Sequence, residues 1–192
     1  ELLQVLEQEC GQFLTAFEGI SGNALQAVVK HLPSVGNPFA PESIPDYCVL
    51  VELTTSIAAK STGIDLQVVL ERCLENLFDD VSDNALIQNA VIGRGKDLWR
   101  IRHAISEAIR HEGKIIAFDI SMPRSALVAF RVQALALMAE KYSWIKVMDF
   151  GHWADGGCHF NLAWPTNEAQ TYQVDTVQEI RAMIYDLVVQ HY

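Results

Sequence analysis

Residues 144–164, WIKVMDFGHWADGGCHFNLAW, decide the fold of this protein. Two runs rich in β-branched and aromatic residues, 144–152 and 158–164, flank Asp155 and Gly156. An Asp-Gly pair between two such runs is the strongest short-range signal for a β-hairpin. Strands joined by so short a connection can only be antiparallel. The stretch therefore argues against a wholly parallel, doubly wound sheet.

On both sides of this hairpin the chain alternates strand-like and helical segments. The expected further strands are 13–18, 47–54, 84–92 and 114–121. Apolar periodicity predicts helices at 2–10, 23–32, 65–78, 95–111 and 123–141, and a last helix that starts at a capping box, Thr176 to Glu179. This order predicts an α+β, ferredoxin-like fold, in which helices cover one side of a largely antiparallel sheet.

Length and charge limit the classes of function. A chain of 192 residues with 50% apolar and 20% charged residues is expected to form a single domain. A net charge of −10 excludes nucleic acid as an expected partner. No apolar run approaches the roughly 20 residues of a transmembrane helix, so we expect no membrane-spanning segment. Four cysteines without C-x-x-C spacing predict reduced, intracellular thiols: Cys10, Cys48, Cys73 and Cys158.

The hairpin carries a first candidate site. If its turn is centred on Asp155 and Gly156, His152 lies directly opposite His159 on one face of the sheet. Two imidazoles so placed can share a metal ion, and Asn161 adds an amide to the same face. Zinc would need at least one more protein ligand. The alternative is a pair of partly exposed histidines that stack across the hairpin without a metal.

A second candidate lies on the expected helix 95–111. A helical wheel places Arg102 and Ser106 beside the apolar stripe, whereas the other charged side chains, Arg110 included, project to the opposite half. A guanidinium beside a buried stripe needs a carboxylate or several carbonyl oxygens. That partner is either a small acid ligand or an internal carboxylate, Glu18 or Glu52. The residues alone favour the internal ion pair.

Residues 151–161, together with 98–102 and 118–123, resemble the C-terminal domain of FAD-linked oxidases in the vanillyl-alcohol-oxidase superfamily. The superfamily includes D-lactate, glycolate and D-2-hydroxyglutarate dehydrogenases, and the sharpest match is to its pattern G-H-x-G-D-G-N-x-H-x-N. The resemblance implies that His152 and His159 bind a divalent metal, usually zinc. It implies that Arg102 grips the carboxylate of a small 2-hydroxy acid, and that Ser106 and Asn161 line the substrate pocket.

The resemblance also has departures. Ala154 and Gly157 replace the Gly and Asn of the family pattern. Ala117 stands where hydroxyglutarate-type members carry a lysine, which favours a 2-hydroxy acid with one carboxylate or with a different distal group. The family's Ser-x-E-H-G motif, which supplies a third metal ligand and the catalytic base, does not occur before Tyr192.

The expected function follows from this resemblance. Residues 1–192 are expected to be a single substrate-binding cap domain, a fragment of a longer flavoenzyme that is inactive alone and contains no catalytic residue. The whole enzyme would be an FAD-dependent 2-hydroxyacid dehydrogenase or oxidase that passes hydride to a flavin with help from the metal. FAD would be bound mainly by a separate N-terminal domain and reoxidised by an electron acceptor. We expect a cytoplasmic location, with a peripheral position at the inner membrane as an alternative.

Two functions of other classes stay open from the residues alone. One is a non-catalytic ferredoxin-like binding or assembly module with no metal site, in which Arg102 forms a structural ion pair. The other is a metal-dependent hydrolase, which needs a third metal ligand and a general base. Asp149 and Asp155 are the nearby acids, and a regular ladder would point Asp149 away from the histidines.

Overall fold

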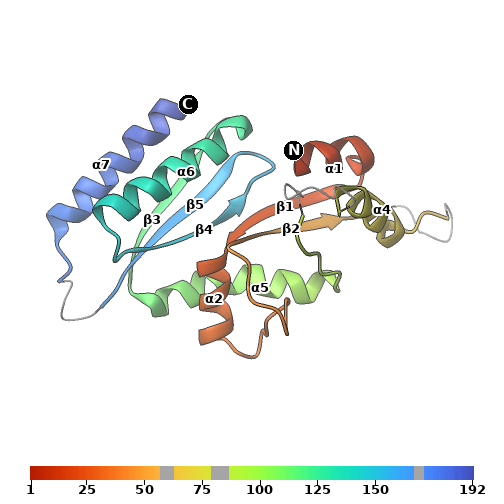
Figure 1. Ribbon diagram of the computed structural model, residues 1–192, viewed down its shortest axis with the longest axis horizontal. Helices are drawn as coiled ribbons and strands as arrows, with labels where there is room; N and C mark the ends of the chain where they lie inside the picture. The colour runs from red at the N-terminus through yellow and green to blue at the C-terminus, as the bar shows by residue number, and fades with distance from the viewer. Residues whose placement is uncertain (57–62, 79–86, 167–170) are drawn as a thin grey trace.

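A computed structural model describes residues 1–56, 63–78, 87–166 and 171–192. Its centre is a five-stranded sheet with the strand order β2-β1-β4-β5-β3 (Figure 1). The strands are β1 (Leu14–Ser21), β2 (Tyr47–Leu53), β3 (Lys114–Ser121), β4 (Lys146–His152) and β5 (Gly157–Trp164). The helices are α1 (Leu2–Cys10), α2 (Gly22–His31), α4 (Leu66–Phe78), α5 (Gly95–Ala108), α6 (Arg124–Lys141) and α7 (Val174–His191), with a 3₁₀ turn, η1 (Ile109–Glu112), between α5 and β3.

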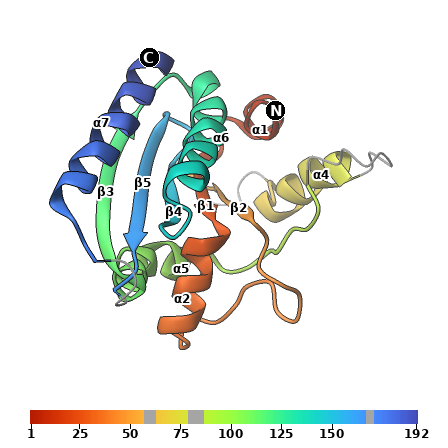
Figure 2. The same cartoon turned by 60° about the vertical axis from the view of Figure 1, so that its left-hand side comes forward.

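All four strand pairings are antiparallel, which confirms the α+β class. The expectation that helices cover one side of the sheet is wrong. Helices α6 and α7 lie on one face, and α2 and α5 lie on the other (Figures 1 and 2). The reason is visible in β4 and β5, where successive side chains point to opposite faces. Phe160 is buried on one face and Phe150 on the other, so both faces need a cover.

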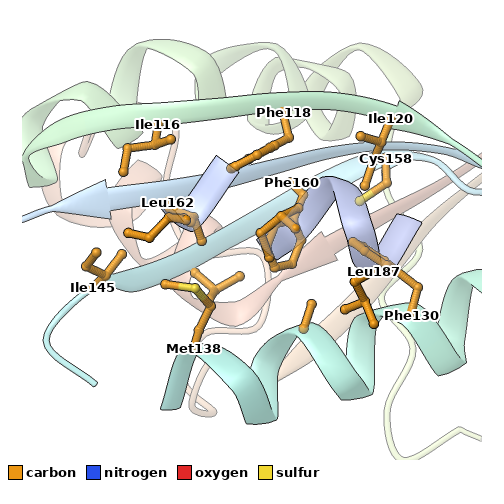
Figure 3. Close-up of a cluster of buried hydrophobic side chains, with 14 of the residues drawn as sticks. Ile116, Phe118, Ile120, Phe130, Met138, Ile145, Cys158, Phe160, Leu162 and Leu187 are labelled. Atoms are coloured by element: carbon orange, nitrogen blue, oxygen red, sulfur yellow. The ribbon is translucent and has the colours of Figure 1, made fainter. Parts of the chain in front are cut away.

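The face under α6 and α7 holds the largest apolar cluster (Figure 3). Phe160 is fully buried at its centre, and its ring meets Phe118 of β3 and Phe130 of α6 edge to face, with centroids 6.4 and 5.5 Å apart. Ile116, Leu162 and Leu187 pack around these rings. This packing holds Phe160 and Leu162 of β5 against α6 and α7. The residues that alternate with them therefore point to the opposite face of the sheet, toward α5.

The opposite face packs against α2 and α5. The stripe Ile101, Ile105 and Ile109 is buried there against Met148 and Phe150 of β4, as the periodicity of residues 95–111 predicts. α5 therefore lies directly over the strands that carry the two hairpin histidines.

Three expected segments differ in the structure. The predicted strand 84–92 falls partly on residues 84–86, outside the described residues, and residues 87–92 form no strand, with Val91 and Ile92 exposed. β1 continues to Ser21 where a turn was expected from Gly19, because Ser21 still pairs with Tyr47 of β2. The last helix begins at Val174, two residues before the expected capping box, with Gln173 at its N-cap.

The four cysteines are free thiols, as their spacing predicts. Burial raises the pKa of Cys48 to about 12, which keeps this thiol protonated and weakly reactive. Among the described residues, no helix is long and apolar enough to span a membrane.

Candidate functional site

The β4–β5 hairpin has a wider connection than the sequence predicts. Its ladder pairs Phe150 with His159, so His152 is not directly opposite His159, contrary to expectation. Residues 153–156 form a four-residue turn, in which the Gly157 N–H donates to the Asp155 carboxylate, 2.9 Å away. This Asx-type turn keeps the turn residues out of the ladder and shifts the register by two.

Gly156 is required at the end of this turn. Its φ is +85°, and a Cβ at this position would lie 2.0 Å from the carbonyl oxygen of Met122. A residue with a side chain would clash with that backbone and would strain at this φ.

The two histidines nevertheless share one face, because an even register shift preserves the side on which a strand residue points. Their rings stand edge to face with centroids 5.9 Å apart. The Nδ1 of His152 hydrogen-bonds to the buried carboxylate of Glu18, and the Nδ1 of His159 lies 3.2 Å from Asp119. A carboxylate on one ring nitrogen is the arrangement found around metal-binding histidines, because it leaves the other nitrogen free to coordinate.

The described residues include no group of three His, Cys, Asp or Glu side chains that could hold a metal ion. Asp149 belongs to the other face, as a regular ladder predicts. It is fully buried, and the guanidinium of Arg131 on α6 binds it through Nε, 2.6 Å away, and Nη2, 3.3 Å away. The interpretation of this chain as a metal-dependent hydrolase requires a third metal ligand, and the described residues place none beside the two histidines.

Arg102 has an internal partner, as one of the two alternatives predicts. Its Nε donates to Glu18 Oε2 across 2.7 Å, and its guanidinium lies over the Phe150 ring, 4.6 Å from the centroid. Arg102 is 8% exposed and Glu18 is 2% exposed. The other possible partner, Glu52, instead accepts a hydrogen bond from Trp99. The ion-pair interpretation is confirmed, with Glu18 as the partner.

Glu18 connects the two candidate sites. It lies on β1 directly beside His152 of β4. Its two carboxylate oxygens bind different groups: Oε2 accepts a hydrogen bond from Arg102, and Oε1 is hydrogen-bonded to His152. A single buried carboxylate thus holds the arginine from α5 and the histidine from the hairpin in fixed positions.

A cleft of about 250 Å³ lies beside this pair, between the C-terminal half of α5 and strands β3 and β5. Arg102, Ser106 and Asn161, the three residues predicted to bind substrate, all line it together with His159. His152 is not among its lining residues. The structure thus brings together four of the five predicted site residues in one cleft, with the fifth joined to it through Glu18.

The cleft contains two charged residues that the sequence interpretation did not assign to a site. Arg110 and Asp119 line it along with Ala117, Phe118, Phe150 and Ile109. The spacing of Arg102, Ser106 and Arg110, four residues apart each time, is a signal that could have found Arg110, since such residues follow one side of a helix. A second cavity, of about 550 Å³, lies between β2, α4 and residues 87–93, and none of the predicted site residues lines it.

Comparison with known proteins assigns the family. The sequence profile of the family described as FAD linked oxidases, C-terminal domain, matches residues 3–192. The chain belongs to this family. The resemblance of residues 151–161 and their flanking segments to this family is confirmed.

Three individual relatives share the name D-2-hydroxyglutarate dehydrogenase. The chain is 27% identical over 191 residues to the mitochondrial D-2-hydroxyglutarate dehydrogenase of Arabidopsis thaliana, covering 100% of this chain and 32% of the relative. It is 29% identical over 171 residues to D-2-hydroxyglutarate dehydrogenase of Xanthomonas citri pv. viticola, covering 89% and 34%. It is 32% identical over 153 residues to the enzyme of the same name from Stutzerimonas stutzeri, covering 79% and 31%. The chain spans about a third of the length of these relatives.

Proposed function

We propose that this FAD-linked oxidase C-terminal domain is the substrate-binding cap of an FAD-dependent 2-hydroxyacid dehydrogenase, and that the cleft beside α5 binds the 2-hydroxy acid. One observation carries the proposal: Arg102, Ser106 and Asn161 line a single cleft next to His159. The buried Arg102–Glu18 pair alone would equally suit a non-catalytic module. The gathering of the other polar groups around that arginine favours the enzyme.

Arg102 would hold the carboxylate of the substrate. Its Nε is occupied by Glu18, and its Nη nitrogens form no hydrogen bond within the described residues. Arginine presents its donors in a rigid fork that matches a carboxylate. Because Glu18 and Phe150 already fix the guanidinium, little conformational entropy would be lost when the acid binds.

Ser106 and Asn161 would orient the rest of the substrate. Ser106 lies one helical turn after Arg102, so its hydroxyl lies on the same side of α5. Asn161 comes from β5, and its amide Nδ2 donates to the carbonyl of His159, which leaves its amide oxygen for a ligand hydroxyl. The cleft thus offers polar contacts from both of its walls.

His152 and His159 fit two positions of a metal site. Their Nδ1 atoms are bound or approached by carboxylates, and their rings are adjacent on a half-exposed face. A divalent ion such as zinc would, when bound, polarise the substrate hydroxyl, and FAD on the separate flavin domain would take up the hydride before passing electrons to an acceptor. This chain's part is to bind and orient the acid, and we assign it no proton-abstracting base.

The full-length flavoprotein that carries this chain provides the test. We expect it to show the absorbance of bound flavin and to reduce a redox dye only when a 2-hydroxy acid is present. Lactate, glycolate, malate and 2-hydroxyglutarate, each as separate enantiomers where these exist, form the panel. A folded protein with bound flavin that reduces no dye with any of these acids would contradict the proposal, and a protein that binds no flavin would favour the non-catalytic module.

Zinc titration of this chain tests the histidine pair. With two protein ligands the chain should bind zinc weakly, and His152→Ala or His159→Ala should lower the affinity at least about tenfold, since even outer-shell changes cost about 10–100-fold. Competition with a chromophoric chelator measures the affinity. His103→Ala is the matched control, because this histidine stacks on Trp99 on α5, away from the hairpin. Tight stoichiometric zinc binding that is unchanged in His152→Ala would contradict the assignment of the histidine pair as metal ligands.

A further inference from the structure

One side of the cleft carries two arginines, one from α5 and one from η1. Arg102, Ser106 and Arg110 follow each other at intervals of four along α5 and η1, and all three line the cleft. At about 1.5 Å of rise per residue, the Cα atoms of Arg102 and Arg110 are about 12 Å apart along the helix. Two long side chains that converge on one cleft from that spacing can hold the two ends of a small molecule.

The opposite wall leaves room for the far end of such a molecule. Ala117 of β3 pairs with Asn161 of β5, and its methyl group is the smallest side chain among the cleft residues. Because η1 leads through Gly113 directly into β3, Arg110 lies at the end of the cleft where β3 begins. Asp119, the carboxylate of the cleft, lies against His159 and so belongs with the hairpin histidines.

The two arginines differ in their state of charge compensation. Arg102 is buried and neutralised by Glu18. Arg110 is exposed at the cleft, and it forms neither an ion pair nor a side-chain hydrogen bond within the ranges that the structure describes. The neighbouring acid of η1, Glu112, is already bound by Lys30, His31 and Lys146. Arg110 is therefore available to an anionic ligand, whose second charge it would balance.

We propose that Arg110 determines specificity for the distal end of the substrate, so that the cleft selects a 2-hydroxy acid with a second carboxylate. The inference rests on the proposed function and deepens it. It also changes the expectation drawn from Ala117. The cation absent from β3 at that position is supplied instead from η1, and the small side chain of Ala117 makes space for the distal carboxylate.

Steady-state kinetics of the full-length enzyme test the inference with matched substrates. Arg110→Gln is expected to lower kcat/KM for malate and 2-hydroxyglutarate about 10- to 100-fold, since hydrogen bonds to charged groups are strong and one of them would be lost. For lactate, which has no second carboxylate, the change should stay below about threefold. Lys96→Gln is the control, because it removes the same charge from the exposed side of α5, outside the cleft.

A relocation variant separates a lost contact from a damaged fold. Adding Ala117→Lys to Arg110→Gln returns a cation to the same cleft from the opposite wall, and it should restore part of the lost dicarboxylate activity. An Arg110→Gln effect that is equal for lactate and for the dicarboxylates would overturn the inference. So would a wild-type enzyme that oxidises lactate and shows no preference for either dicarboxylate.

A binding measurement distinguishes failure of this inference from failure of the proposed function. If no 2-hydroxy acid is oxidised, the proposed function fails, and titration calorimetry with glutarate and butyrate still decides the role of Arg110. Glutarate should then bind the wild type at least about tenfold more tightly than it binds Arg110→Gln, with butyrate unaffected. Equal binding of glutarate to both proteins would overturn the inference.

Discussion

Glu18→Gln is expected to lower the free energy of unfolding by about 3–5 kcal/mol, the usual cost of removing one partner of a buried ion pair. Glu18 is 2% exposed, and its carboxylate is bound by Arg102 and His152 on its two oxygens. A neutral amide would leave the buried guanidinium of Arg102 without a counter-charge. It would also present an NH₂ group to one of two donors.

Urea unfolding measured by circular dichroism checks this value. Glu52→Gln is the matched control, because Glu52 lies on the neighbouring strand β2 and its carboxylate accepts hydrogen bonds only from the uncharged groups of Trp99 and Thr15, each worth about 1 kcal/mol. Replacing both partners, Glu18→Leu with Arg102→Met, should recover much of the stability, since a buried pair can often be replaced by apolar residues of similar volume. A loss for Glu18→Gln no larger than that of Glu52→Gln would show that the pair is not a structural anchor.

Arg102→Lys is expected to lower kcat/KM of the full-length enzyme by about 100-fold for every 2-hydroxy acid while the domain stays folded. Lysine keeps a positive charge beside Glu18, so the buried pair survives. It cannot, however, bind Glu18 with one nitrogen and clasp a second carboxylate with two others, as the guanidinium can. A hydrogen-bonded charge contact contributes about 1.5–3 kcal/mol, and about 2.7 kcal/mol corresponds to 100-fold in rate.

The pattern across substrates identifies the cause of this effect. Arg102→Lys should affect lactate and malate alike, because both carry the carboxylate next to the hydroxyl, whereas Arg110→Gln should affect malate alone. Arg100→Lys serves as the control on the same helix, since Arg100 is exposed and hydrogen-bonds to Ser34. A folded Arg102→Lys enzyme with wild-type kcat/KM would reduce Arg102 to a structural role and would favour the non-catalytic interpretation of the cleft.

The hairpin shows how far local sequence reasoning reaches. Its antiparallel pairing and the shared face of His152 and His159 were predictable, because strand side chains alternate with a period of two. That the two histidines do not lie directly opposite each other was not predictable from the sequence. The Asp155 side chain accepts a hydrogen bond from the Gly157 N–H, and the turn has four residues where two were expected. The register shift was even, so the prediction of the face survived an error in the register.

The position of Arg110 shows the limit of a regular helical wheel. The wheel assumes 100° per residue along the whole of 95–111, and it places Arg110 in the half opposite the apolar stripe. The structure ends α5 at Ala108 and continues as a 3₁₀ turn from Ile109, and Arg110 of that turn is exposed. Arg110 nevertheless lines the cleft with Arg102 and Ser106. The interval of four residues between these three side chains is the signal for its position, and the apolar stripe is not.

The sequence by itself determined the α+β class, the antiparallel hairpin, the buried stripe of α5 and the family, because each depends on residues close together in the chain or on a pattern spread over all of it. The tertiary structure alone decided that Arg102 pairs with Glu18 and not with Glu52. Glu18 is separated by 84 residues from Arg102 and by 134 from His152. Only the placement of β1 next to β4, under α5, brings the three groups together, and that placement follows from packing both apolar faces of one sheet.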